Sequence, residues 1–136
     1  MRTHLAAALG AVALTTSMLV GASPAAGVGG SAYPTSAFEV VVGNTYTKGI
    51  ITWYNRSVHV AGEHKSVDPA SCRGTTAYTL DSADRQLGKN VSPYLVCGLS
   101  RTFSFDVPAD VPGGAAVVRV CLDDGVKALE CSRHGR

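Results

Sequence analysis

Four cysteines carry the clearest chemistry in this sequence of 136 residues: Cys72, Cys97, Cys121 and Cys131. An even number of cysteines in a short exported chain is typical of disulfides. A zinc site is disfavoured, because the cysteines are widely spaced and form no C-x2-C pair. Four cysteines allow three pairings, and spacing alone does not choose among them. We favour Cys72–Cys97 and Cys121–Cys131, because each pair closes a local loop of hairpin size.

A second polar group consists of His59 and His64, with Glu63 between them. It has the residue types of half a metal site or of an acid–base pair. On a straight strand, however, the odd spacing places the two imidazoles on opposite faces, and only a bulge at Gly62 would bring them together. We therefore predict solvent-facing strand histidines. Asp123-Asp124 lacks EF-hand spacing and is predicted to lie in a hairpin turn.

The sequence contains none of the motifs that commonly mark an enzyme. It has no Gly-x-Ser-x-Gly nucleophile elbow, and no glycine-rich phosphate loop leads from a strand into a helix. We predict no catalytic residues, no bound metal and no cofactor.

Aromatic side chains are the most suggestive binding groups, namely Tyr33, Tyr46, Trp53 and Tyr54. An exposed platform of such rings holds sugars in many β-sandwich modules. Trp53 lies in the middle of a strand beside Ile51, where packing in the core is the default. Tyr54 belongs to the opposite face of that strand. Tyr54 and Tyr46 are therefore the candidate ligand-binding residues.

The first 25 residues have the pattern of a signal peptide. Arg2 precedes an apolar stretch over residues 5–20, and the small residues Ser23 and Ala25 predict cleavage after Ala25. No basic stop-transfer cluster follows the apolar stretch. We expect a secreted, extracellular protein with no membrane contact after cleavage.

Composition limits the remaining chain to one small domain. Hydrophobic residues make up 46% and charged residues 16%, which is too apolar for a disordered chain. The formal charge of only +2 excludes a strongly basic nucleic-acid-binding protein. We expect a flexible N-terminal segment over residues 26–36, a β-domain over residues 37–131 and a frayed tail over residues 132–136.

Alternating apolar and polar residues position these groups on strands. Candidate strands cover residues 38–42, 49–54, 57–60, 75–80, 85–89, 94–97, 103–107, 116–123 and 126–131. No helical period persists over ten residues in this part of the chain. About seven strands separated by turns predict an all-β, antiparallel sandwich of two sheets, because facing sheets bury both apolar faces.

The last hairpin presents a choice between a tight turn and a disulfide. A two-residue turn at Asp124-Gly125 leaves the Cα atoms of Cys121 and Cys131 about 10 Å apart or more. A disulfide needs roughly 4.4–6.8 Å. We expect the bond, and therefore a longer loop that places Leu122 beside Glu130.

The order of several features resembles a fibronectin-III-like or immunoglobulin-like module over roughly residues 37–131. The features are Ile51-Thr52-Trp53, Thr76–Leu80 with a turn and a return strand, Phe103–Pro108, and Pro112-Gly113-Gly114 leading into Val117–Val120. This resemblance implies an immunoglobulin-like sandwich and no particular activity, since such folds host many functions. The whole chain is also similar in style to the small secreted proteins of high-GC Gram-positive bacteria.

These observations favour a non-enzymatic secreted module that binds an unknown extracellular ligand or has a structural role. Two alternatives stay open. One is a small secreted protease inhibitor, in which disulfides brace a reactive loop. The sequence lacks the cysteine spacing and the Pro-Met-Cys-Thr pattern of the bacterial subtilisin inhibitors. The other is a small-molecule carrier like the enediyne-binding apoproteins.

Overall fold

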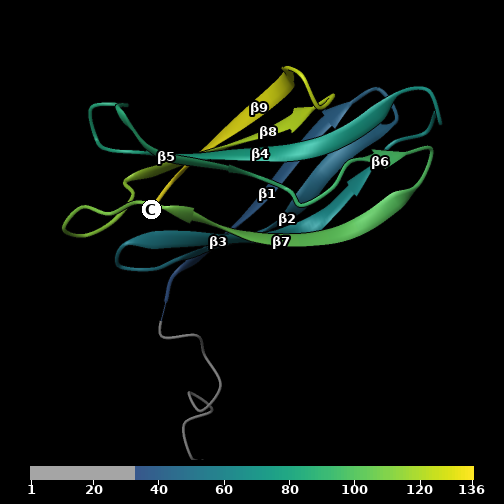
Figure 1. Cartoon of the computed structure of the whole chain (residues 1–136). Helices are drawn as coiled ribbons and strands as arrows, with labels where there is room; N and C mark the ends of the chain where they lie inside the picture. The colour runs from purple at the N-terminus through teal and green to yellow at the C-terminus, as the bar shows by residue number, and fades with distance from the viewer. Residues whose placement is uncertain (1–32) are drawn as a thin grey trace, which may run out of the picture. The chain divides into compact units, whose positions relative to one another are not determined.

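The computed structural model describes residues 33–136 as strands, turns and loops, without a helix. The predicted signal peptide over residues 1–25 lies outside the described residues, as does most of the segment over residues 26–36. No helix within residues 33–136 has the length and apolarity needed to span a membrane. The described part forms two antiparallel sheets that lie face to face, so the predicted all-β sandwich is confirmed (Figure 1).

The first sheet contains four strands in the order β1-β2-β3-β7. Their bounds are Thr35–Val42 for β1, Thr45–Trp53 for β2, Ser57–Lys65 for β3 and Ser100–Pro108 for β7. The second sheet has the order β5-β4-β8-β9, and the short strand β6 also pairs with β4. The bounds here are Cys72–Leu80 for β4, Gln86–Val91 for β5, Val96–Cys97 for β6, Val117–Asp123 for β8 and Ala128–Gly135 for β9.

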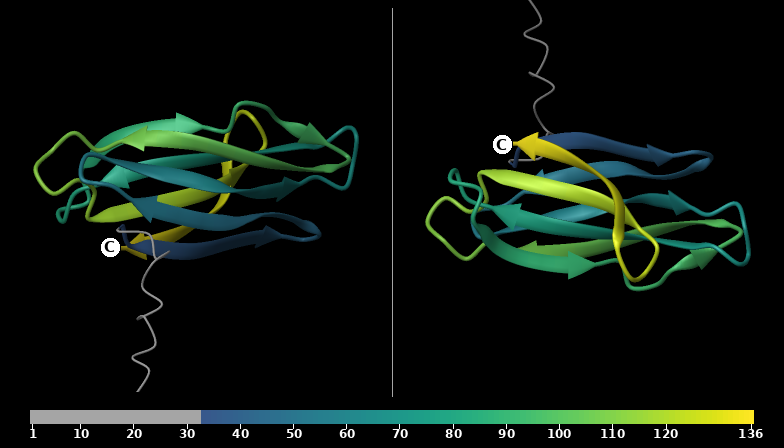
Figure 2. Two further views of the ribbon diagram at one scale, coloured as in Figure 1. Left: turned by 90° about the horizontal axis from the view of Figure 1, so that it is seen from below. Right: turned by 90° about the horizontal axis from the view of Figure 1, so that it is seen from above.

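The two sheets meet along their edges as well as through their faces. β9 runs beside β1 at one edge, and β5 runs beside β7 at the other (Figure 2). At the second edge, the side-chain amide of Asn90 donates a hydrogen bond to the backbone carbonyl of Asp106 at 2.8 Å. These contacts cover backbone groups that an open sheet edge exposes.

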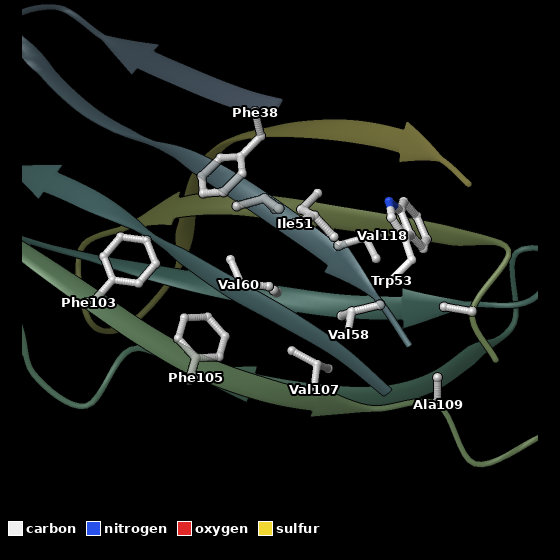
Figure 3. Close-up of a cluster of buried hydrophobic side chains, with 13 residues drawn as sticks. Phe38, Ile51, Trp53, Val58, Val60, Phe103, Phe105, Val107, Ala109 and Val118 are labelled. Carbon is white, nitrogen blue, oxygen red and sulfur yellow. The ribbon is translucent and has the colours of Figure 1, made fainter. Parts of the chain in front are cut away.

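The alternation predicted from the sequence directs one face of each strand into a common core (Figure 3). The largest buried side chains include Trp53, Ile51, Phe103 and Val118. Trp53 is 1% exposed, which confirms its predicted place in the core. Its indole N–H donates to the Ser36 hydroxyl at 3.0 Å, so burial leaves this donor satisfied.

Both predicted disulfides are present, and each joins residues that are paired across neighbouring antiparallel strands. Cys72 pairs with Cys97 between β4 and β6, and Cys121 pairs with Cys131 between β8 and β9. The last hairpin has the longer loop that the second bond requires. Leu122 pairs with Glu130 as predicted.

Three details differ from the sequence-based expectation. The sheets contain nine strands rather than about seven. β1 begins at Thr35, so it includes the last residues of the segment expected to be flexible. β9 continues to Gly135, which pairs with Val117, so residues 132–135 form a paired strand and not a frayed tail. The start of β1 and the end of β9 are ordered because neighbouring strands supply their backbone hydrogen bonds. The pattern of residues in these two segments does not show that such partners exist.

Candidate functional site

The two predicted ligand-binding tyrosines lie too far apart to form one platform. Tyr46 lies near the start of β2 and Tyr54 just after its end, so about 26 Å of extended strand separates them. The ring of Tyr54 contacts Tyr33 edge to face, with centroids 4.6 Å apart. Ligand binding by either tyrosine stays a prediction.

Tyr46 is already engaged by its own sheet. Its hydroxyl donates to the Glu63 carboxylate, and the Lys48 ammonium lies 4.6 Å from the centroid of its ring. The hydrogen bond to Glu63, followed by partial burial and the negative charge of Glu63, raises the pKa of Tyr46 above its ordinary value. A ligand at this position therefore competes with contacts inside the protein.

The two histidines point to opposite faces of β3, as the odd spacing predicted. His59 lies on the outer face, where its Nδ1 is 2.7 Å from the Asp106 carboxylate. His64 is completely buried, so the prediction that it faces solvent is wrong. β3 continues straight through Gly62, which directs His64 to the face covered by the second sheet.

The imidazole of His64 belongs to a buried polar chain between the two sheets. Its Nδ1 lies 3.2 Å from the Thr75 hydroxyl, which in turn lies 2.7 Å from the Thr47 hydroxyl. The backbone of Thr75 exchanges hydrogen bonds with Ser92 in the next loop. Nε2 of His64 has no hydrogen-bond partner within the described residues. Burial lowers the pKa of His64 below its ordinary value, so the neutral ring is favoured in the folded protein.

A hollow of about 420 Å³ lies on the outer face of the second sheet. Thr76 and Tyr78 of β4 form its floor together with Asp123 of β8. Residues 91–95 form one wall and residues 125–128 form the other. We call this feature the outer hollow.

The wall over residues 125–128 is shaped by two aspartates that bind backbone N–H groups. The Asp123 carboxylate accepts hydrogen bonds from the Thr76 hydroxyl at 2.7 Å and from the Gly125 amide at 2.8 Å. Asp124 accepts from the amides of Lys127 and Val126, and these bonds lower its pKa. Asp123 is the last residue of β8 and Asp124 begins the loop, so the predicted hairpin is present but its turn does not include Asp123. Both carboxylates are thus directed to groups of the protein itself.

The opposite wall is fixed by hydrogen bonds to both sheets. The Ser92 amide donates to the Thr75 carbonyl at 2.7 Å, and the Tyr94 hydroxyl donates to the Thr102 carbonyl at 2.7 Å. The side chain of Leu95 packs against Gly74 and Gly125, and a Cβ atom at either glycine would overlap it. The absence of side chains at these two glycines therefore leaves the space that Leu95 occupies beside the hollow.

Apolar and cationic groups both reach the outer hollow from solvent. Leu95 is 46% exposed and Val126 is 95% exposed. The Lys89 ammonium lies 5.5 Å from the ring centroid of Tyr78, and the Arg119 guanidinium lies 4.4 Å from it. Lys127 lies on the far wall. These groups come from segments that are distant in the sequence, and no spacing rule connects them.

No set of three or more histidine, cysteine, aspartate or glutamate side chains in residues 33–136 is arranged to hold a metal ion. No family model matches the chain, and no curated protein or solved structure matches it either.

Proposed function

We propose that this protein is an exported, non-enzymatic binding module that holds a small ligand in the outer hollow. The observation that carries the proposal is the hollow itself, with its volume of about 420 Å³ between two exposed loops. Small-molecule sites are typically concave, of this size, and lined by apolar and aromatic groups with a few polar ones. Leu95, Val126 and Tyr78 supply the apolar and aromatic groups of the hollow. Lys89 and Lys127 supply polar groups.

The scaffold supports this role because it holds both walls in place before a ligand arrives. The Cys72–Cys97 bond lies directly after the wall over residues 91–95, and the Cys121–Cys131 bond closes the hairpin that carries the wall over residues 125–128. A preformed site loses less conformational entropy when it binds.

The topology and the disulfides also support the expected module type and location. β3 pairs with β7 and β4 pairs with β8, while the chain crosses between the sheets from β3 to β4 and again from β7 to β8. This interleaved order agrees with an immunoglobulin-like sandwich. Two disulfides in a small β-domain are compatible with an extracellular location. Mass spectrometry of the culture supernatant tests export, with a mature chain expected to start near Ala26.

Binding is tested by titrating the ¹⁵N-labelled protein with a neutral aromatic probe, 2-naphthamide. We expect the amide signals of the two walls, residues 91–95 apart from Pro93 and residues 125–128, to shift in a saturable way. Val126→Ser should weaken binding by about threefold, because it removes exposed apolar surface from the wall. The matched control is Val67→Ser, since Val67 is 51% exposed on a different loop. Saturable shifts confined to Tyr46 and its neighbours would show that the outer hollow is not the site.

The small-molecule carrier is the alternative that the outer hollow favours, because a carrier uses an enclosed site of this kind. Protease inhibition stays a prediction, and a titration against a subtilisin-like and a trypsin-like protease checks it. Complete inhibition at a one-to-one ratio would identify a protein partner in place of a small ligand.

A further inference from the structure

We infer that the ligand of the outer hollow is a small aromatic anion, with a carboxylate or sulfonate group on a flat apolar body. This inference rests on the proposed function. It follows from the charges that surround the hollow, from which of them are already paired, and from the shape of its lining.

Two cationic side chains, Lys89 and Lys127, line the hollow. Within the described residues neither forms an ion pair, although Lys127 lies close enough to Asp124 to interact with its charge. Lys89 and Arg119 flank Tyr78 on the two neighbouring strands, because Tyr78 pairs with Lys89 of β5 and with Arg119 of β8.

The one acidic group in the lining, Asp123, is withdrawn from the opening of the hollow. Asp123 is 8% exposed, and both of its carboxylate oxygens accept hydrogen bonds from the protein. One oxygen of Asp124 accepts the two amide hydrogen bonds of its own loop. An anionic group at the opening therefore meets Lys89 and Lys127 first, while the negative charge of Asp123 lies largely covered in the floor. A cationic ligand would meet repulsion at the same place.

The lining favours a flat ligand of limited size. Tyr78 is half-buried in the floor, and Pro93 and Tyr94 belong to one wall. The Arg119 guanidinium next to Tyr78 is also planar, and guanidinium groups stack on aromatic rings. A volume of about 420 Å³ lies within the range of small-molecule sites.

The experiment compares three probes with one ring system and different charges: 2-naphthoate, 2-naphthamide and 2-naphthylmethylammonium. Each is titrated into the ¹⁵N-labelled protein at low salt, and the dissociation constant is taken from signals of residues 91–95 and 125–128. We expect 2-naphthoate to bind about fivefold more tightly than the amide, since two partly exposed ionic contacts contribute modestly. The ammonium probe should bind most weakly. Added salt should weaken binding of the naphthoate and leave the amide unchanged.

The double variant Lys89→Gln/Lys127→Gln should abolish the preference for 2-naphthoate while the amide binds as before. The matched control is Lys48→Gln, because Lys48 also lies over a tyrosine ring, but on the outer face of the first sheet. The control should keep the full preference.

The outcomes separate this inference from the proposed function. If the amide binds the outer hollow as tightly as the naphthoate, or if the double variant keeps the preference, the anion is not the recognised group and only this inference is overturned. If none of the three probes shifts the signals of the hollow, the proposed function fails as well.

Discussion

Cys121 and Cys131 lie directly opposite each other on β8 and β9, with their Cα atoms 4.0 Å apart. This separation is close to that of the narrow residue pairs in an antiparallel ladder. The disulfide and the strand pairing therefore specify the same register. That register excludes a two-residue turn and produces the loop that forms one wall of the outer hollow.

Removal of this disulfide should destabilise the protein without changing its strand pairing. The bond closes a loop with a sequence separation of 10, so the chain-entropy relation predicts that Cys121→Ala/Cys131→Ala lowers the free energy of unfolding by about 3 kcal/mol. The Cys72–Cys97 bond closes a longer loop, with a separation of 25, so Cys72→Ala/Cys97→Ala should cost about 0.8 kcal/mol more. Urea denaturation of both double variants measures the difference. Equal stability of the wild type and the first variant would contradict the prediction.

Replacement of the buried indole should be among the most costly single changes. Trp53→Ala removes the largest side chain of the core and should lower the free energy of unfolding by about 3–5 kcal/mol. Ser36→Ala, which removes only the partner of the indole N–H, should cost about 1 kcal/mol. Because Trp53 is the single tryptophan, its emission maximum reports burial directly. An emission maximum typical of water-exposed tryptophan in the wild type would contradict this account.

The buried imidazole of His64 should make the protein less stable in mild acid. Burial lowers the folded-state pKa below the unfolded value of about 6.5, so the unfolded chain binds a proton first. The stability contributed by the neutral ring is complete above about pH 6.5 and is lost as the pH falls towards the folded-state pKa. The slope attributable to this residue is at most about 1.4 kcal/mol per pH unit.

His64→Gln should therefore flatten the dependence of stability on pH below about pH 6.5. His134, whose pKa is also lowered by burial, should retain its own contribution in this variant. Denaturation curves recorded at several pH values for the wild type and the variant provide the measurement. Parallel curves over this range would mean that His64 does not determine the acid sensitivity.

Gly49 and Gly62 should tolerate no side chain, because they are paired where β2 and β3 approach closely. A Cβ atom on Gly49 would overlap the carbonyl oxygen of Ala61, and one on Gly62 would overlap the carbonyl oxygen of Lys48. Gly49→Ala should lower the free energy of unfolding by about 2–3 kcal/mol. Gly135→Ala serves as the control, since a Cβ atom there meets nothing within 4 Å and should change stability by less than about 0.5 kcal/mol. Similar effects of the two substitutions would refute the close approach.

The sequence alone determined the features that depend on local patterns. Period-2 alternation, as in Phe103 and Phe105, predicts strands because it describes how successive side chains leave a pleated backbone. The geometry of antiparallel pairs was sufficient to relate the Cys121–Cys131 bond to a longer loop, and the strand position of Trp53 was sufficient to predict its burial.

Which segments meet in space depends on long-range packing. His64 is buried because Thr75 of the other sheet covers its face of β3, and the residue pattern around His64 carries no information about that sheet. β9 continues to Gly135 because β8 offers it backbone hydrogen bonds. The outer hollow brings Tyr78, Lys89 and Lys127 together from three separate segments. Their proximity follows from the pairing of β4 with β5 and β8, a long-range contact set by packing of the whole chain rather than by any local spacing.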